Sequence, residues 1–528
     1  MLNPSANGHD VYDYMEGNVS DFYNAVDDAI AKSECVKGQY RITTSPAYNS
    51  TSPVKTPNFT TLGISSSGPI VVDLENSFIT AEPEITLSSS LARAAACSSK
   101  LFVGWKSAFE AIRQYDILVN SSPIYTQSFA GTESFVQDQI LTELVKNTSP
   151  YTYTSYEEVK KSSPNVCGTY IDFQAAYVVN TPIKVTFPIK IPLTQFLILK
   201  NLKYLCSWMG KWELRIYFNW ENLVVAPVKP SFEPLAYDAY KVTGDTATVG
   251  FTQVGDKFTG INKVDSATTA GTSAVTCGDE VVTVSSMETH TVEVNLATFQ
   301  LRMDVNEELK ARYSDRPLTF PVSTFQISRF SGAPNWGGAG TQLSIVLCQS
   351  VNNCDTVFLL FPETPNQRTV FRNPKLNGLQ LICGEFGAYP QQPIKTHSDP
   401  KFLNICGDAL NVNSSPLTSF SYDTANSFMD TIPIIKSAGG ADDTKQFALH
   451  DNSNFFVGIP FSIDDDFQGG LSSPSSNINF KLIATTTKDL SAWTTPLIAC
   501  FLIDGSIMIK PDPMGETARV IYTDRTIC

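Results

Sequence analysis

The sequence lacks the features that mark most catalytic sites. Its 528 residues include only four histidines, His9, His290, His397 and His450. None of them lies in a His-Glu-x-x-His pattern, a Gly-x-Ser-x-Gly elbow or a Cys/His cluster, which are the patterns that place metal-binding or nucleophilic side chains. We therefore predict no catalytic residue, no cofactor and a structural or solvated role for each histidine.

Positive charge is also scarce. The chain has 38 Lys and Arg against 52 Asp and Glu, a formal net charge of −14, and no run of five or more basic residues. A protein that grips nucleic acid by its phosphates needs clustered Lys and Arg, because released counterions supply most of the affinity. This balance argues against packaging of nucleic acid by a basic arm and predicts no sequence-specific nucleic-acid binding.

The eleven cysteines include no Cys-x-x-Cys pair, and their number is odd. Cys97, Cys206, Cys383 and Cys500 lie inside runs of apolar or small residues. This pattern is typical of small hydrophobic side chains in a core that forms in a reducing compartment. It favours neither a disulfide framework nor a zinc site.

Long hydrophobic runs are missing as well. No apolar run reaches 18 residues, so we expect no transmembrane segment. The first twenty residues contain neither a basic n-region nor an apolar h-region, and we therefore expect no secretory signal peptide.

A possible phosphate-binding loop at Gly210-Lys211 is better explained as a strand. A P-loop needs a glycine five positions before the Gly-Lys pair and Ser or Thr after the lysine, whereas Leu205 and Trp212 occupy those positions. The following residues alternate between apolar and polar, which is the period of a strand with one wet face. The apolar members are Trp212, Leu214, Ile216 and Phe218.

Aromatic residues are plentiful at 11%, whereas only 17% of residues are charged, against about 25% in average globular proteins. Most segments read as strands, and the chain is long enough for two or three domains. We predict an acidic arm with a short helix and an extended connector (1–70), a first β domain (71–228), a Thr/Gly-rich connector or β excursion (229–290), a second β domain (291–512) and a tail (513–528).

The N-terminal arm contains one amphipathic helix. Ser20 is a suitable N-cap, and apolar residues then recur every four positions at Phe22, Val26 and Ile30. Two interpretations are equally favoured. The helix packs on its own domain, or these three residues dock on a neighbouring subunit during assembly.

Two segments of the second domain contain aspartates with a possible local role, as a cation site in one case and as a turn in the other. Asp464, Asp465 and Asp466 are a weak candidate for binding a hard cation such as calcium, because they lack EF-hand spacing and a solvated loop explains them better. Asp504-Gly505 lies between two apolar runs, which predicts a tight hairpin turn.

The two β domains repeat a pattern. "IKIPLTQF" precedes the strand "KWELRIYF" in the first, and "VGIPFSID" precedes "NINFKLIA" in the second. Near the middle, "AFEAIRQYDILVNSSPIY" and "VFRNPKLNGLQLICGEFGAYP" both contain a strand, a turn and an exit with proline. The repeat predicts two successive β-sandwiches.

These segments resemble double-jelly-roll major capsid proteins, such as those of virophages and Polinton-like viruses. "AFEAIRQYDILVNSSPIYTQSF…ESFVQDQILTEL" is similar to a strand, loop and amphipathic helix of that family. "IPLTQFLILKNLKYLCSWMGKWELRIYF" and "FFVGIPFSID…NINFKLIATTTKD…TTPLIACFLIDG" are similar to the ends of its two rolls. The resemblance covers about 90–225 and 290–510.

The resemblance implies an all-β fold of two tandem jelly-roll sandwiches with a few short helices. It implies a structural protein, not an enzyme, whose homotrimers are pseudo-hexameric and tile an icosahedral virion shell around a double-stranded DNA genome. Its partners would be neighbouring capsomers, a vertex penton protein and minor capsid proteins. The alternative from the residues is a tandem β-sandwich that binds carbohydrate or acts on it, because paired carboxylates are set in space rather than along the chain.

Overall fold

A computed structural model describes most of the chain between residues 19 and 523. The described residues are 19–32, 36–44, 48–50, 59–89, 100–105, 108–129, 168–172, 177–218, 223–228, 273–277, 280–313, 317–329, 336–348, 351, 353–362, 373–383, 387–396, 400–409, 432–435, 444–447, 455–461, 479–511 and 518–523.

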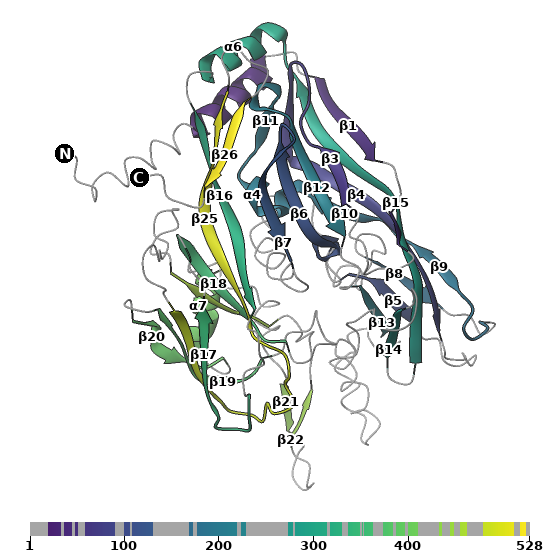
Figure 1. Ribbon diagram of the computed structural model, residues 1–528, viewed down its shortest axis with the longest axis vertical. Helices are drawn as coiled ribbons and strands as arrows, with labels where there is room; N and C mark the ends of the chain where they lie inside the picture. Colours follow the sequence, from purple (N-terminus) through teal and green to yellow (C-terminus); the bar gives the residue numbers. More distant parts are fainter. Residues whose placement is uncertain are drawn as a thin grey trace.

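The described chain is dominated by antiparallel strands in two groups (Figure 1). In the first group one sheet has the order β1-β15-β4-β10 and the other β3-β12-β6-β7. The strands of these sheets are β1 (Val36–Thr44), β3 (Phe59–Gly63), β4 (Ile70–Ser89), β6 (Ile112–Val119), β7 (Ser122–Ser128), β10 (Ile189–Pro192), β12 (Trp212–Phe218) and β15 (Glu280–Gln300).

The second group repeats this arrangement. Its sheets have the orders β16-β25-β18-β23 and β17-β24-β19-β20. Their strands are β16 (Leu318–Arg329), β17 (Gln342–Cys348), β18 (Cys354–Leu360), β19 (Leu376–Cys383), β20 (Ala388–Ile394), β23 (Val457–Pro460), β24 (Asn479–Thr486) and β25 (Ile498–Lys510).

The strand order identifies each group as a jelly roll. When the eight strands of either group are counted along the chain, one sheet runs first-eighth-third-sixth and the other second-seventh-fourth-fifth. That order belongs to the eight-stranded double-sheet sandwich with two Greek keys. The predicted fold class, an all-β chain of two tandem jelly rolls, is therefore confirmed.

The sequence repeat matches this order. "IKIP" and "VGIP" form β10 and β23, the sixth strands of their sandwiches. "WELRIYF" and "NFKLIATT" form β12 and β24, the seventh strands. The predicted alternation in β12 is confirmed, because Trp212, Leu214, Ile216 and Phe218 are buried and the residues between them are half-buried.

Additional short strands extend the first sandwich at the end where β4 and β15 run past β10. These are β2 (Tyr48–Ser50), β5 (Lys100–Gly104), β8 (Gly168–Asp172), β9 (Ile183–Thr186), β13 (Val224–Val228) and β14 (Ser273–Cys277), and β11 (Tyr204–Cys206) pairs with β4 at the opposite end. In the second sandwich β21 (Ile432–Ile435) pairs with β22 (Thr444–Phe447), and β26 (Arg519–Thr523) pairs with β25.

The helices of the described chain are short. They comprise an N-terminal helix (19–32), α4 (Leu197–Lys200), α6 (Met303–Tyr313) and α7 (Pro400–Ala409), with 3-10 turns η1 (Ala108–Ala111), η2 (Leu193–Gln195) and η3 (Ser207–Met209). None of the helices in the described part of the chain has the length and apolar character needed to cross a membrane.

Strand pairing sets the extent of the first sandwich differently from the sequence prediction of 71–228. β1 and β3 precede residue 71, yet they pair with β15 and β12. β15 begins at residue 280, inside the Thr/Gly-rich stretch, yet it pairs with β4 along most of its length. These partners are far apart in sequence, so local composition did not reveal them.

One predicted turn is wrong. Asp504 and Gly505 lie within the continuous strand β25, where they pair with Ser323 and Val322 of β16. An Asp-Gly pair favours a two-residue hairpin when its flanking strands pair with each other. Here both flanks pair with the long neighbour β16, so the strand continues. By contrast, the predicted polar turn after β6 is present, with Asn120 and Ser121 at positive φ.

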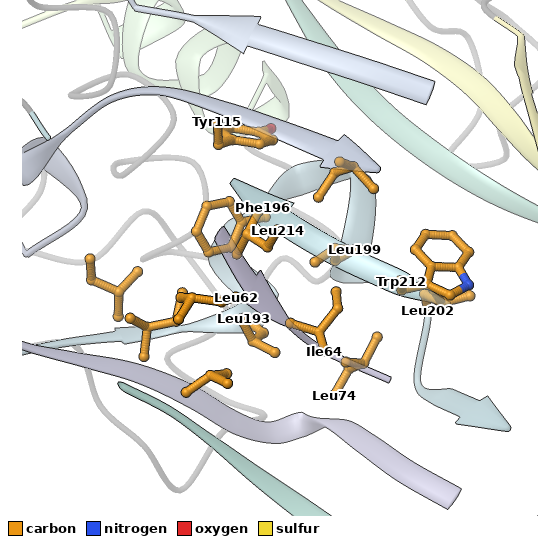
Figure 2. Close-up of a cluster of buried hydrophobic side chains, with 14 of the residues drawn as sticks. Leu62, Ile64, Leu74, Tyr115, Leu193, Phe196, Leu199, Leu202, Trp212 and Leu214 are labelled. Atoms are coloured by element: carbon orange, nitrogen blue, oxygen red, sulfur yellow. The ribbon is translucent and has the colours of Figure 1, made fainter. Parts of the chain in front are cut away.

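The first hydrophobic core lies between the two sheets of the first sandwich (Figure 2). Leu62 from β3, Tyr115 from β6 and Leu214 from β12 meet Phe196 and Leu199 from the segment that follows β10. Trp212 is fully buried in the same core, and its indole nitrogen donates a hydrogen bond of 3.1 Å to the carbonyl of Met209.

We expect Trp212→Ala to lower the free energy of unfolding by about 3–5 kcal/mol, since it removes a large buried side chain. The adjacent Lys211, whose side chain is 70% exposed, provides a matched control. Lys211→Ala should change the free energy by about 0.5 kcal/mol or less. Urea midpoints of the two variants test this, and equal shifts would show that the assignment of the buried face of β12 is wrong.

Candidate functional site: the seam between the two sandwiches

The sandwiches are joined by strands that belong to both hydrophobic cores. The first core contains Phe320 and Val322 of β16 and Ile507 of β25. The second core contains Phe325 of β16 and Ile503 of β25. Figure 1 shows these two long strands running from the second sandwich up to the side of the first. The sandwiches cannot separate without exposing apolar surface of the first core, and we call this joint the seam.

The N-terminal helix packs on the seam through Phe22. This ring is fully buried and makes edge contacts with Trp208 of the first sandwich, Tyr313 of α6 and Phe320 of β16, at centroid distances of 5.3–6.1 Å. Edge-to-face pairs contribute about 0.5–1.5 kcal/mol each beyond burial. One side chain thus holds the helix, the first sandwich and a strand of the second together.

The predicted assembly residues are therefore placed in the chain's own core. Phe22 and Val26 are both 0% exposed, and Ile30 is half-buried against the same core. Of the two interpretations of this helix, packing on its own chain describes the single chain. Phe22 and Val26 are unavailable to a neighbouring subunit while the helix stays docked. Docking of these residues on a neighbouring subunit during assembly stays a prediction.

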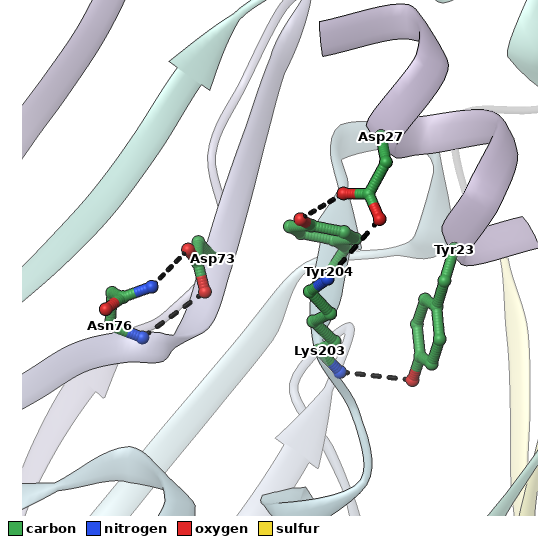
Figure 3. Close-up of polar contacts among 6 residues, drawn as sticks. All are labelled: Tyr23, Asp27, Asp73, Asn76, Lys203 and Tyr204. Carbon is green, nitrogen blue, oxygen red and sulfur yellow. Dashed lines mark hydrogen bonds and ion pairs between the residues drawn. The ribbon is translucent and has the colours of Figure 1, made fainter. Parts of the chain in front are cut away.

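Polar contacts fix the other side of the helix (Figure 3). Asp27 accepts a hydrogen bond of 2.6 Å from the hydroxyl of Tyr204 and lies 3.4 Å from the ammonium of Lys203. The hydroxyl of Tyr23 accepts a hydrogen bond of 3.1 Å from the backbone nitrogen of Lys203 and donates to the carbonyl of Asn201. Burial raises the pKa of Tyr23, which keeps the hydroxyl protonated as a donor. These bonds fix the rotation of the helix about its axis.

A second polar group, also drawn in Figure 3, shapes β4 below the helix. Asp73 is 5% exposed and accepts hydrogen bonds from the backbone and side chain of Asn76, at 3.2 and 2.6 Å. The hydroxyl of Ser77 donates a hydrogen bond to the carbonyl of Asp73 and accepts one of 3.0 Å from the backbone nitrogen of Ala297 in β15. The contacts lie where the β4–β15 register shifts, so they satisfy backbone groups that the bulge leaves unpaired.

The C-terminal strand β26 closes the seam on the side of β7. It pairs with β25, and the ring of Tyr522 lies 5.2 Å from that of Tyr125 in β7. The Tyr522 hydroxyl lies 3.0 Å from the hydroxyl of Thr324. The side-chain amide of Asn120 donates to the carbonyl of Ala518 at 3.0 Å. This short strand therefore contacts both sandwiches.

Several predicted residues fall elsewhere. Asp464, Asp465 and Asp466 lie outside the described residues, as do His9, His397, His450 and Cys97, while His290 lies in β15. Within the described residues no group of three or more His, Cys, Asp or Glu has metal-binding geometry. Cys206, Cys383 and Cys500 are buried free thiols, as predicted. Burial raises the pKa of Cys383 to about 12, so it remains a protonated thiol.

No protein-family model matches the chain, and no curated protein matches it. Solved structures of similar fold do match. A chain of the Sputnik virophage matches with a TM-score of 0.48 and 12% identity over 93% of this chain and 89% of that one. The mavirus major capsid protein matches with a TM-score of 0.46 and 11% identity, over 93% of this chain and 91% of that one. The Faustovirus major capsid protein matches with a TM-score of 0.44 and 9% identity, over 90% of each chain. The last two are named as capsid proteins.

Phe22→Ala should lower the free energy of unfolding by about 3–5 kcal/mol, because the ring is buried between three others. Asn24→Ala, at an exposed position of the same helix, is the matched control and should be nearly neutral. Urea unfolding of the purified chain measures both. If Phe22→Ala left the stability of the chain unchanged but blocked assembly of particles, the interpretation as a docking arm would replace packing on the chain's own core.

Proposed function

We propose that the chain is the major capsid protein of an icosahedral virus with a double-stranded DNA genome. In this proposal it is a structural protein, not an enzyme, and its place is the shell of the virion. The observation that carries the proposal is the same eight-strand order in two successive sandwiches. Jelly rolls of this kind build viral capsids, and they also occur in lectins. The segments that carry the sequence resemblance coincide with the sixth and seventh strands of both rolls.

The proposed building block is a homotrimer. Each subunit contributes two similar sandwiches joined by a packed seam, so three subunits present six similar bodies around one axis. A closed ring with cyclic symmetry needs one repeated heterologous contact between subunits. The pseudo-hexameric outline that follows can tile a surface with neighbours of the same kind. A separate penton protein at the vertices and minor capsid proteins are the further partners that this arrangement calls for.

The charge of the chain supports the role of a shell protein rather than that of a protein that binds nucleic acid through its phosphates. With a net charge of −14 and no basic run, the chain has no basic stretch that could neutralise many phosphates at once. Compaction of the genome would then depend on other molecules. The shell protein would enclose the DNA without reading its sequence.

Light scattering of the purified protein should give a mass near 174 kDa, three times 57.9 kDa, because three subunits complete the six-bodied ring. Negative-stain images should show particles with a hexagonal outline. A stable monomer that binds a glycan on an array would contradict the proposal and favour the carbohydrate-binding alternative.

A further inference from the structure

The shared strands change from one core to the other at a band of polar residues. On β16 the last residue of the first core is Val322 and the first of the second core is Phe325. On β25, Asp504, Gly505 and Ser506 separate Ile503 from Ile507. Ser323 pairs with Asp504 across the two strands, so the interruption lies at the same level on both. We call this level, with Lys200 and Asn353 beside it, the waist.

Asp504 is the buried charge at the waist. It is 8% exposed, and its carboxylate accepts a hydrogen bond of 3.1 Å from the hydroxyl of Ser323. Asn353 binds the backbone of Asp504 twice. The Asp504 nitrogen donates a hydrogen bond of 3.1 Å to the Asn353 carbonyl, and the side-chain amide of Asn353 donates one of 3.3 Å to the Asp504 carbonyl. A neutral hydroxyl stabilises a carboxylate less than a charged donor does. The strand is thus anchored at a point where ionisation is costly.

The first sandwich supplies the cation that faces this group. Lys200 ends α4, which packs on β16, and Leu197 of the same helix lies in the second core. α4 therefore crosses the waist. The other ionisable groups around Asp504 are Asp355 and Cys354 of β18. Tyr522 of β26 bonds Thr324, the neighbour of Ser323 on β16.

Burial and the nearby Asp355 carboxylate raise the pKa of Asp504 well above its usual range, while Ser323 and Lys200 oppose the rise. Burial lowers the pKa of Lys200 to about 8. When folding raises the pKa of a carboxyl group, the folded arrangement of the waist is stabilised at pH values below the ordinary pKa of that group. This stabilisation is lost as the pH rises through the pKa of the group in the folded chain. Lys200 acts in the opposite direction, since the closed state is favoured again as the pH rises from about 8 toward the ordinary value of 10.5.

We propose that the waist is a proton-controlled hinge between the two sandwiches. With Asp504 neutral, the β16–β25 pairing at this level is closed and the sandwiches are held at one angle. Ionisation of the buried carboxylate draws water to the waist and loosens the pairing there. The upper halves of both strands stay fixed by the first core, the N-terminal helix and β26, so the second sandwich tilts as a body below them.

Hydrogen exchange of the full-length protein tests the hinge. Peptides that cover 318–329 and 498–510 are followed at pH 5, 7 and 9 in the wild type and in Asp504→Asn, and the two proteins are compared at each pH so that intrinsic exchange rates cancel. We expect a small difference at pH 5, which lies little more than one unit above the ordinary pKa of 3.8, and a larger one as the pH rises. At pH 7 the wild type should exchange faster than Asp504→Asn, by roughly tenfold for each unit of the pKa rise that has been titrated.

Three further variants complete the test. Lys200→Gln removes the cation that lowers the pKa of Asp504 in the closed waist. The loss of protection should therefore continue to a higher pH than in the wild type, and the recovery of protection at pH 9 should disappear. Ser323→Ala removes the hydroxyl bond to the carboxylate, which also extends the loss of protection to higher pH. This variant replaces Asp504→Asn in the test if Asp504→Asn does not fold. Glu307→Gln, at an exposed position of α6, should match the wild type.

Equal protection of the wild type and Asp504→Asn at pH 7 would overturn the hinge. Faster exchange in Asp504→Asn at every pH would overturn it as well, because the ionised carboxylate would then hold the waist closed. A loss of protection that ends at the same pH in the wild type, Lys200→Gln and Ser323→Ala also counts against it. These readouts concern one chain, so they are independent of whether it forms a trimer.

Discussion

The structure depends on the burial of β16 and β25 in two cores at once. An isolated jelly roll buries its strands between its own two sheets, whereas the upper halves of these strands carry Phe320, Val322 and Ile507 into the neighbouring sandwich. Burial of apolar side chains contributes about 1.5–3 kcal/mol each for residues of this size. Several such side chains therefore oppose separation of the sandwiches, and the seam behaves as part of a hydrophobic core rather than as a contact between two domains.

The N-terminal helix and β26 depend on the same strands. Phe22 contacts Phe320, and Tyr522 approaches Thr324, so both chain-terminal elements are fastened to β16. The polar bonds of Asp27 and Tyr23 then add direction to a contact that apolar burial alone would leave free to rotate. Elements from the two ends of the described chain thus stabilise one joint, and their contribution is to geometry as much as to stability.

The sequence predicted the architecture because two kinds of local signal repeat along it. Alternating apolar residues marked β12 and its buried face, and the paired motifs before β12 and β24 marked equivalent strands of two sandwiches. Pairings between distant segments left no such signal. β15 begins within a stretch poor in large apolar residues, and nothing near it in sequence indicates that β4 and β1 are its neighbours.

The candidate site was harder to predict for the same physical reason. The apolar face of the N-terminal helix was visible at Phe22 and Val26, but periodicity shows that a face is buried and not which surface buries it. Asp504-Gly505 carried the local signal of a turn, and long-range pairing with β16 overrode it. Predictions from local sequence fail most often at functional or strained positions, and the turn wrongly predicted at Asp504-Gly505 lies at the waist.

In the proposed shell, a subunit made from two sandwiches would have to meet opposing requirements. Each sandwich would keep its position relative to the other so that contacts repeat from one subunit to the next, whereas a curved shell would present the same subunit to neighbours at different angles. Apolar burial above the waist meets the first requirement, since losing it would expose several large side chains together. The polar level at Ser323 and Asp504 confines any change of angle to one place. Adjustment there leaves both cores intact, whereas bending through either core would break close packing that tolerates little distortion.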